Sequence, residues 1–324
     1  MALTPRENGL EVINWGKPEY VPLTSEVYHY FRSASALMNH PYETGRDVFG
    51  VNWILTRDGA IPEPNKFLFT EISDWRKKVV FPDPNQYGFE SCAKSDLKNI
   101  DKSERLINVI SATGLFERLV AFMGFENALC ALFEDPDECG EFFSALTDYF
   151  TRCLSGVIDA YRPDVITYFD DLATARGLFM SPEVYRSVIK PYHRKIVDCV
   201  TAKGVVFAQH ICGKCEDILE DFVELGIQIW SSAQIMNDLQ RIKKEFYGRL
   251  VIEGGWDTSG PCSYNEATVE VAIAEAKRCI EEYGPNGGFI LQPTIMNERG
   301  NSSVVGDPRL DEIIRIWPEI SRIY

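Results

Sequence analysis

The chain has 324 residues, of which 45% are hydrophobic and 25% charged, so it has the size and composition of a globular enzyme. Lys and Arg number 33 against 48 Asp and Glu, and the net charge of −15 would repel a phosphate backbone, which excludes nucleic acid as an expected partner. No apolar run approaches the roughly 20 residues of a membrane span and the first residues lack the features of a secretory signal, so we expect a cytoplasmic protein without membrane contact.

Cysteine and histidine counts limit the chemistry open to the chain. Nine cysteines in a chain without an export signal are expected to be reduced, and an odd number leaves one outside any full set of disulfides. Most of these thiols are expected to pack in the core as small hydrophobic groups. Chemistry that needs an imidazole has only four candidates, which are His29, His40, His193 and His210.

The chain falls into two parts by pattern. Residues 1–100 are irregular and rich in turn residues, with one strand expected at 20–23, and we interpret them as an elaborated N-terminal region. From 105 to 324 short apolar strands alternate with amphipathic helices. The clearest helix covers 137–161, where Phe150 and Val157 share one apolar stripe.

The remaining elements follow in chain order. Strands are expected at 106–110, 164–169, 205–208, 227–231, 250–252 and 288–291. Helices are expected around 116–123, over 182–202, 214–225 and 265–283, and from about 237 and 307 onward. A proline just inside the helix start at Ser181 and a glycine just past the end at 284 are typical helix boundaries, and Pro191 is expected to kink its helix.

This alternation predicts parallel βαβ units in a single α/β domain over 1–324. About seven strands suit a (β/α)8 TIM-like barrel with an elaborated N-terminal region better than an open six-stranded sheet. The chain has neither a Gly-x-Gly-x-x-Gly fingerprint nor a phosphate-binding Gly-Lys-Ser/Thr loop, so dinucleotide and ATP binding are not indicated. In such a barrel the functional side chains follow the carboxyl ends of the strands.

The strand end at 209–215 carries the strongest chemical signal. Residues two apart in an extended chain point to the same side, so His210 and Cys212 should both face the barrel interior. An imidazole and a thiolate together form half of a tetrahedral zinc site. Gly213 allows a sharp turn after them, and Cys215 is close enough to be considered as a third ligand. The competing interpretation is a hydrogen-bonded interior histidine beside two packing cysteines.

Acidic side chains follow two other strands. Asp170 and Asp171 end the strand at 164–169, and because adjacent side chains diverge, at most one of them should point inward. Glu253 precedes two glycines that would let the backbone approach a ligand closely. We treat these acids as catalytic candidates that donate or accept a proton. Helix caps, loop ion pairs and an ordinary tight turn are the competing interpretations.

Aromatic and sulfur side chains near the expected loops could form the walls of an apolar substrate funnel. Each of them is also compatible with ordinary core packing. The candidate substrate-binding residues are Phe49, Trp53, Phe116, Met123, Glu126, Gln234 and Trp256.

Several motifs together resemble the uroporphyrinogen decarboxylase superfamily over most of the chain from about residue 105. They are His210-Ile-Cys-Gly, Phe169-Asp170-x-x-Ala173, Ser181-Pro182-Glu183-x-Tyr185 and Pro191-Tyr192. Within this superfamily, the His-x-Cys-Gly motif after a strand resembles that of the corrinoid-protein methyltransferase branch. The segments Asp47–Trp53 and Met123–Asn127 look most like the veratrol type, which acts on aromatic methyl ethers.

The resemblance implies a methyltransferase that moves a methyl group from a small methylated aromatic substrate, by O-demethylation, to cobalt in a corrinoid carried on a partner protein. An Asp-x-His-x-x-Gly cobalt-ligand motif is absent around the four histidines, which supports a separate corrinoid protein. Zinc on His210 and Cys212 would activate the ether oxygen, and an inward acid such as Asp170 or Glu253 would assist protonation. The sequence leaves the direction of transfer and the oligomeric state open, with a homodimer as one option.

The chain departs from the resembling pattern at the third zinc ligand. Relatives with His-x-Cys usually add a cysteine in a Pro-Gly-Cys context, whereas this chain has Gln292-Pro293-Thr294. The remaining candidates, in decreasing order, are Cys215, Glu253, Gln234 and Cys262. If none binds zinc, an acid-assisted mechanism without metal remains.

Two other functions stay open. A decarboxylase-like lyase would have to hold a porphyrinogen with eight carboxylates, which an acidic chain without an Arg-Gln-Ala-Gly-Arg motif disfavours. A non-catalytic barrel that binds a corrinoid protein is the second alternative.

Overall fold

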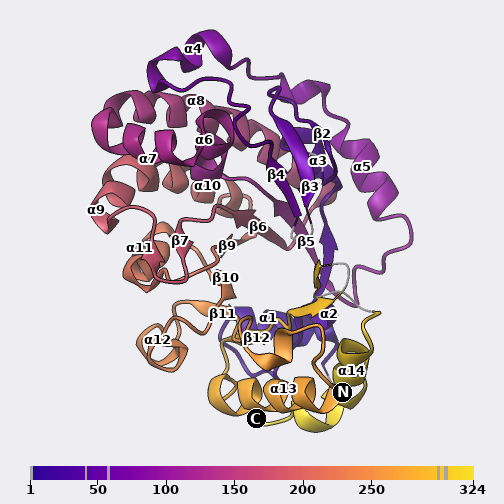
Figure 1. Cartoon of the computed structure of the whole chain (residues 1–324). Coiled ribbons are helices and arrows are strands. Elements are labelled where there is room, and N and C mark those ends of the chain that lie inside the picture. The colour runs from indigo at the N-terminus through magenta and orange to yellow at the C-terminus, as the bar shows by residue number, and fades with distance from the viewer. Residues whose placement is uncertain (1–2, 41, 57–58, 298–299, 303–305) are drawn as a thin grey trace.

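The computed structural model describes residues 3–40, 42–56, 59–297, 300–302 and 306–324. Within them, seven parallel strands form one curled sheet in the order β1-β5-β6-β9-β10-β11-β12, with helices packed along its outer face (Figure 1). The strands are β1 (Tyr28–Phe31), β5 (Leu106–Ser111), β6 (Val165–Phe169), β9 (Val206–His210), β10 (Ile229–Ala233), β11 (Val251–Gly254) and β12 (Phe289–Leu291). The expected parallel α/β barrel of the TIM type is therefore confirmed.

The first strand is not where the sequence pattern placed it. Residues 20–23 contribute a single parallel bridge between Leu23 and Leu291, beside a hydrogen bond from the Leu291 N–H to the Pro22 carbonyl at 2.9 Å. Pro22 lacks an N–H donor, so this segment cannot pair along its length as a central strand does. The chain instead makes the short helix α2 (Thr24–Val27) and then enters β1.

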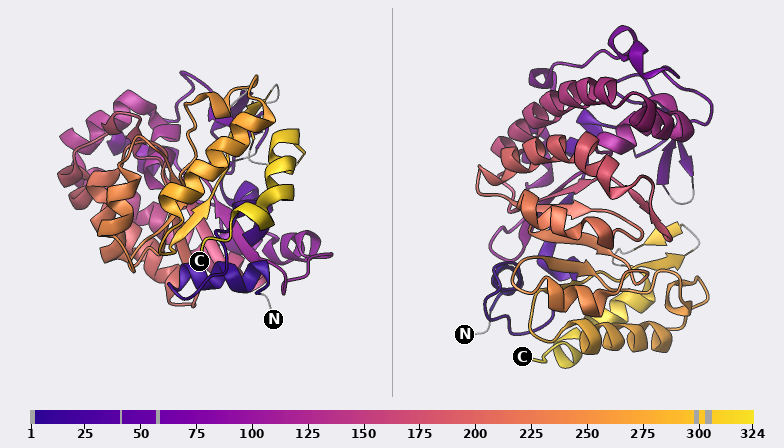
Figure 2. Two further views of the ribbon diagram at one scale, coloured as in Figure 1. Left: turned by 90° about the horizontal axis from the view of Figure 1, so that it is seen from below. Right: turned by 90° about the vertical axis from the view of Figure 1, so that its left-hand side faces the viewer.

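The helices on the outer face follow one another around the sheet (Figure 2). They are α6 (Leu115–Met123), α8 (Pro136–Tyr161), α10 (Lys190–Thr201), α11 (Leu219–Leu225), α12 (Leu239–Glu245), α13 (Val269–Tyr283) and α14 (Pro308–Ile320). Helix α13 begins later than expected because Thr268, and not Asn265, caps it by accepting from the Val271 N–H. The expected kink near Pro191 is a π-helical turn over Tyr185–Ile189.

The interior of the barrel begins with an apolar layer. One inward residue of each strand contributes to it, namely Tyr28, Leu106, Val165, Ala208, Ile229, Val251 and Ile290. Val12 and Ile13 of α1 (Pro5–Ile13) pack against this layer, so the N-terminal helix closes that end of the barrel. The interior is thus sealed at the amino ends of the strands.

A polar layer lies directly above the apolar one. Side chains two residues further along a strand face the same side. In six of the strands this position holds Tyr30, Asn108, Thr167, His210, Ser231 and Glu253. Hydrogen bonds join neighbours around the ring: Thr167 donates to Asn108 Oδ1 at 2.9 Å and Ser231 donates to Glu253 Oε1 at 2.8 Å. The interior therefore changes from apolar to polar toward the carboxyl ends of the strands.

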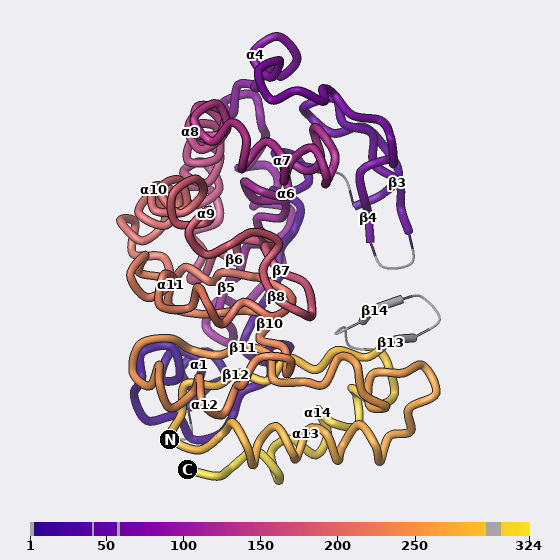
Figure 3. Tube along the Cα trace, turned by 60° about the vertical axis from the view of Figure 1, so that its left-hand side comes forward, coloured from indigo at the N-terminus to yellow at the C-terminus, as the bar shows by residue number. Residues whose placement is uncertain are grey.

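The part of the N-terminal region that follows β1 lies over the carboxyl ends of β1 and β5. A small antiparallel sheet of β2 (Gly45–Arg46), β3 (Asn52–Thr56) and β4 (Gly59–Pro62) stands beside α6 and α7 (Phe125–Glu134). The other short elements are α3 (Ser33–Met38), α4 (Trp75–Lys78), α5 (Phe89–Asp96), α9 (Pro182–Val184), β7 (Ala173–Thr174), β8 (Gly177–Leu178), β13 (Ile295–Asn297) and β14 (Gly300–Ser302). Both termini lie at the end of the molecule that carries α13 (Figures 2 and 3).

No helix among the described residues is both long enough and apolar enough to cross a membrane. The longest, α8, places Phe150 and Val157 in its buried stripe, as the sequence predicts.

Candidate metal and substrate site

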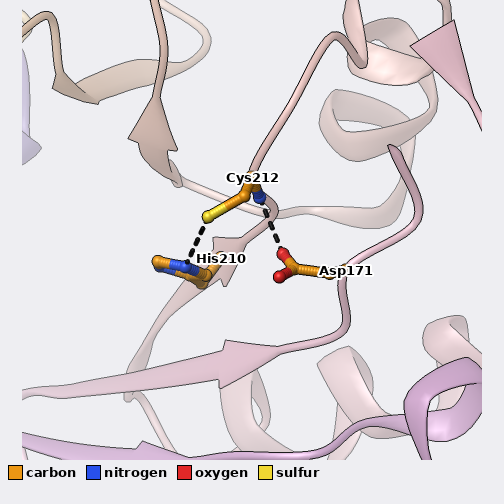
Figure 4. A group of neighbouring side chains, drawn as sticks. All are labelled: Asp171, His210 and Cys212. Carbon is orange, nitrogen blue, oxygen red and sulfur yellow. Dashed lines mark hydrogen bonds between the residues drawn. The ribbon is translucent and has the colours of Figure 1, made fainter. Parts of the chain in front are cut away.

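Three potential metal ligands meet at the carboxyl ends of β6 and β9. One ligand atom each of Asp171, His210 and Cys212 lies within 4.8 Å of the others (Figure 4). His210 is the last residue of β9, Cys212 lies two residues beyond it, and Asp171 lies two residues beyond the end of β6. The alternation of side chains along both strands brings these groups to the same side.

Backbone contacts hold the turn that carries the thiol. The Cys212 N–H donates to Asp171 Oδ1 at 2.7 Å, and the next N–H, that of Gly213, donates to Gln234 Oε1 at 2.7 Å. Gly213 has φ +92°, and a Cβ there would lie 2.6 Å from the Thr174 carbonyl oxygen. Only glycine fits this turn, so the His-x-Cys-Gly pattern has a direct geometric cause.

Burial sets the protonation states of His210 and Cys212. Burial and the nearby Arg32 lower the pKa of His210 to about 3, so its imidazole is neutral and can act as a ligand. Burial and the charge of Asp171 raise the pKa of Cys212 to about 12, so the metal-free site carries a thiol. A metal must displace that proton. Imidazole, thiolate and carboxylate are zinc ligands, and a set of three with an open fourth position is typical of catalytic zinc.

The other residues considered as the third ligand lie outside this group. Cys215 is fully buried at the start of the following helical turn, and its N–H donates to Asn237 Oδ1 at 3.0 Å. Gln234 Oε1 accepts a hydrogen bond from the Gly213 N–H, and the thiol of Cys262 donates to the Asp257 carbonyl at 3.2 Å. Among the described residues, Asp171 is the acid that joins His210 and Cys212.

Contacts with Phe169 and Ser231 orient the His210 ring. Its ring stacks on Phe169 with centroids 3.8 Å apart, and its Nδ1 lies 3.4 Å from Ser231 Oγ. Ser231 in turn donates to Glu253 Oε1. His210 Nε2 then faces Cys212 Sγ at 3.4 Å. Glu253 therefore reaches the group only through Ser231, and not as a ligand.

Glu253 should make stability depend on pH. Burial raises its pKa to about 7 from 4.5, although Ser231, Tyr28 and Tyr30 partly offset the shift. The folded state therefore keeps a proton that the unfolded chain releases above about pH 4.5, and this costs roughly 3 kcal/mol of stability once the pH has risen through about 7. We expect Glu253→Gln to lose less stability than the wild type between about pH 5 and pH 8 in denaturant titrations. Equal pH dependence of the two proteins would contradict this.

Asp170 points away from the group, into the start of α6. Its carboxylate accepts hydrogen bonds from the N–H groups of Phe116 at 3.2 Å and Glu117 at 3.0 Å, and it lies 2.8 Å from His193 Nε2. A Cβ on Gly114 would lie 2.4 Å from the Asp170 Cβ, so a glycine is needed at the helix start. Asp170 thus caps a helix, the competing interpretation that the sequence left open.

A cavity of about 510 Å³ borders Asp171. Its wall contains seven aromatic or imidazole rings, those of His40, Tyr42, Trp53, Phe116, Phe125, Phe169 and Phe179. Arg32, Glu117 and Asp171 are its charged lining residues. Thr113, also in the wall, has φ +61°, an uncommon strained conformation for a β-branched residue. The cavity has the size and apolar character of a small-molecule site.

The candidate substrate-binding residues divide between this cavity and the core. Trp53 and Phe116 line it. Phe49 packs against Phe122 and Tyr149, and Met123 is buried on α6. The other three also lie outside the wall: Glu126 is exposed on α7, Gln234 holds the Gly213 turn, and Trp256 is buried with its Nε1–H donating to Ser263 at 2.9 Å.

Glu117 is a residue of this site that sequence reasoning missed. Burial, together with the charges of Asp171 and Asp170, raises its pKa well above the usual range. Asp171 is affected in the same direction, with a pKa raised to about 6 by burial. Glu117 lies three residues beyond Gly114, so its place in the first turn of α6 was a readable signal. Both acids that line the cavity therefore have pKa values above their usual range.

Fold and site together define a parallel α/β barrel with a candidate metal group at the carboxyl edge of its strands, beside an aromatic cavity. Residues 56–294 match the family described as uroporphyrinogen decarboxylase (URO-D). The chain belongs to this family, and the expected superfamily is confirmed. A solved methyltransferase from Methanosarcina mazei has a similar fold, with a TM-score of 0.61 and 14% identity over 89% of this chain and 92% of that one. No curated protein matches the chain.

Proposed function

We propose that the protein is a methyltransferase that moves a methyl group from a small aromatic methyl ether to the cobalt of a corrinoid carried on a separate protein. The observation that carries this proposal is the group of Asp171, His210 and Cys212 at the edge of an aromatic cavity. The family and the fold shared with a methyltransferase support the reaction class.

Zinc held by Asp171, His210 and Cys212 would supply Lewis-acid chemistry at the ether oxygen. The protein's own residues supply the rest. Trp53 and Phe116 would pack against the substrate ring, since both line the cavity next to Asp171. As the methyl–oxygen bond breaks and the methyl group passes to cobalt, the oxygen keeps the electron pair and takes up a proton. Glu253, which holds a proton near neutral pH, would provide it through the polar layer.

A decarboxylase remains the second candidate because of the family to which the chain belongs. A porphyrinogen with eight carboxylates would meet a single lining cation among the described residues, Arg32, beside the acid Asp171. That charge balance disfavours it.

The deciding experiment supplies zinc-loaded protein with a reduced corrinoid protein and a panel of methoxyaromatics, and follows cobalt methylation by its absorption spectrum. We expect methyl-cobalt to form with at least one ether. If uroporphyrinogen is decarboxylated instead, the proposal is wrong. If the corrinoid protein binds tightly but no methyl donor reacts, the protein is a non-catalytic barrel that binds a corrinoid protein.

Loss of the Ser231 hydroxyl should weaken zinc binding without removing a ligand. Ser231→Ala frees His210 Nδ1 from the contact that fixes its ring, and outer contacts of this kind are worth roughly 10–100-fold in metal affinity. Competition with a chromophoric chelator measures the change. Ser111→Ala, another buried serine at the end of a barrel strand, should leave zinc affinity unchanged. An unaltered affinity in Ser231→Ala would show that the contact does not orient His210.

A further inference from the structure

A second pocket lies between helices α12 and α13 (Figure 1). Its volume is about 680 Å³, which is within the range of small-molecule sites. One wall follows α12 and contains Lys243, Lys244 and Tyr247, and the other consists of residues between 281 and 286. Because α12 and α13 each end shortly before a strand begins, the pocket borders the amino ends of β11 and β12. It is therefore separate from the candidate metal and substrate site at the carboxyl ends of the strands.

Aromatic packing fixes the loop that forms part of this pocket. The ring of Tyr247 meets that of Trp15 edge-on, with centroids 5.1 Å apart. Trp15 also covers Gly288, where a Cβ would lie 2.2 Å from the indole ring, so only glycine fits there. Asn286, Gly287 and Gly288 all have left-handed backbone conformations, with φ values of +68°, +71° and +64°. The pocket is thus bordered by a loop whose shape is set before any ligand binds.

Lys243 places a half-buried ammonium group in the pocket. Its Nζ donates a hydrogen bond to the Gly287 carbonyl oxygen and has two further hydrogens to donate. Among the described residues, no acid forms an ion pair with it. Burial lowers the pKa of Lys243 to about 8 from 10.5, which is expected of an ammonium group that has lost water without gaining a counter-charge.

The other charged groups of the pocket do not supply that counter-charge. Glu282 pairs with Arg278 at 2.8 Å, and Glu281 is exposed to solvent. Lys244, next to Lys243 on α12, adds a second positive charge to the same wall. The two lysines would repel a cation, and a neutral ligand would leave Lys243 without a counter-charge. A carboxylate or phosphate oxygen would instead accept a strong, charge-assisted hydrogen bond from the ammonium group.

We infer that the pocket between α12 and α13 is a binding site for a small organic oxyanion, held by Lys243 and Lys244 with its organic part against the Tyr247 ring. Tyr247 is 60% exposed, so a ligand can reach its aromatic surface. The pocket is larger than a lone carboxylate or phosphate group needs, which is why the ligand carries an organic part. This site goes beyond the proposed function and does not depend on it.

The test measures how fast Lys243 reacts with acetic anhydride at pH 8, with the acetylated lysines identified by mass spectrometry. Phenyl phosphate and benzoate are the two oxyanion probes, and benzamide is the neutral control. A bound anion should raise the pKa of Lys243 and slow its acetylation about 5-fold or more, the effect of a rise from about 8 to about 9. Lys98, which is exposed beyond α5, should react at the same rate throughout. Because the measurement is specific to each lysine, binding of a probe in the aromatic cavity does not register.

The two probes distinguish the sources of the oxyanion. Slowing by phenyl phosphate alone identifies a phosphate ester, slowing by benzoate alone identifies a carboxylate, and slowing by both supports a site that accepts either. Two outcomes overturn the inference: neither anion slows the reaction of Lys243 at millimolar concentration, or benzamide slows it equally.

A variant tests whether Lys243 holds the anion. The bound probe should also slow the acetylation of Lys244 in the wild type, and this protection should disappear in Lys243→Met, which keeps the length of the side chain but not its charge. Lys98→Met is the matched control and should keep the protection. Protection of Lys244 that survives in Lys243→Met would contradict the inference. If Lys243→Met does not fold, the experiment on the wild-type protein still decides the question.

Discussion

Cys212→Ser is expected to abolish stable zinc binding and with it methyl transfer. Serine is nearly the same size, but its hydroxyl does not ionise near neutral pH, so the set loses its thiolate. Loss of a direct ligand should exceed the roughly 10–100-fold effect of losing an outer contact. Zinc content after dialysis and the absorption spectrum of the cobalt(II)-substituted protein measure the change. The cobalt spectrum is informative because the thiolate charge-transfer band disappears only if sulfur is a ligand.

Two variants separate the competing third ligands. Asp171→Ala should reduce zinc affinity, because its carboxylate lies with His210 and Cys212. Cys215→Ala is the matched control, since this thiol is buried close by but outside the group. Zinc retained in Asp171→Ala and lost in Cys215→Ala would reverse our assignment. A fully active preparation free of metal would exclude the zinc mechanism altogether.

Arg118→Met is expected to destabilise the fold by about 3–5 kcal/mol, the usual cost of leaving a buried charge without its partner. Arg118 and Asp47 are both fully buried and form an ion pair. The guanidinium also donates to Asn39 Oδ1 at 3.2 Å, and Asp47 Oδ2 accepts from Trp53 Nε1 at 2.9 Å. The pair joins the N-terminal region to α6, so its loss should also disturb the cavity wall at Trp53.

Urea unfolding measures this effect. Arg315→Ala is the control, since its pairing with Glu312 is exposed and such pairs contribute at most about 1 kcal/mol. The double variant Asp47→Asn with Arg118→Met should recover part of the loss, because no buried charge then remains unpaired. If Arg118→Met is as stable as the wild type, Asp47 is neutral or hydrated in the folded protein.

The alternation of strands and helices could be read from the sequence because it depends on local periodicity. Strands β5, β6, β9, β10, β11 and β12 all lie within a few residues of their expected positions. The strand at 20–23 was misplaced because an apolar run of four residues has no periodicity to distinguish a strand from a packed connection. The true first strand, β1, reads Tyr-His-Tyr-Phe and carries its inward side chains on two tyrosines.

The sequence by itself determined the family, the parallel barrel and the pairing of His210 with Cys212, since residues two apart on a strand must share a face. Thr167 points inward, and steps of two residues from it reach Phe169 and then Asp171, so the same rule selects Asp171 rather than Asp170. Only the tertiary structure decided which side chains from different strands meet. Cys215, Phe49 and Trp256 lie outside the site and Ser231 was added to it, because those contacts depend on the curl and register of the sheet, which no local pattern encodes.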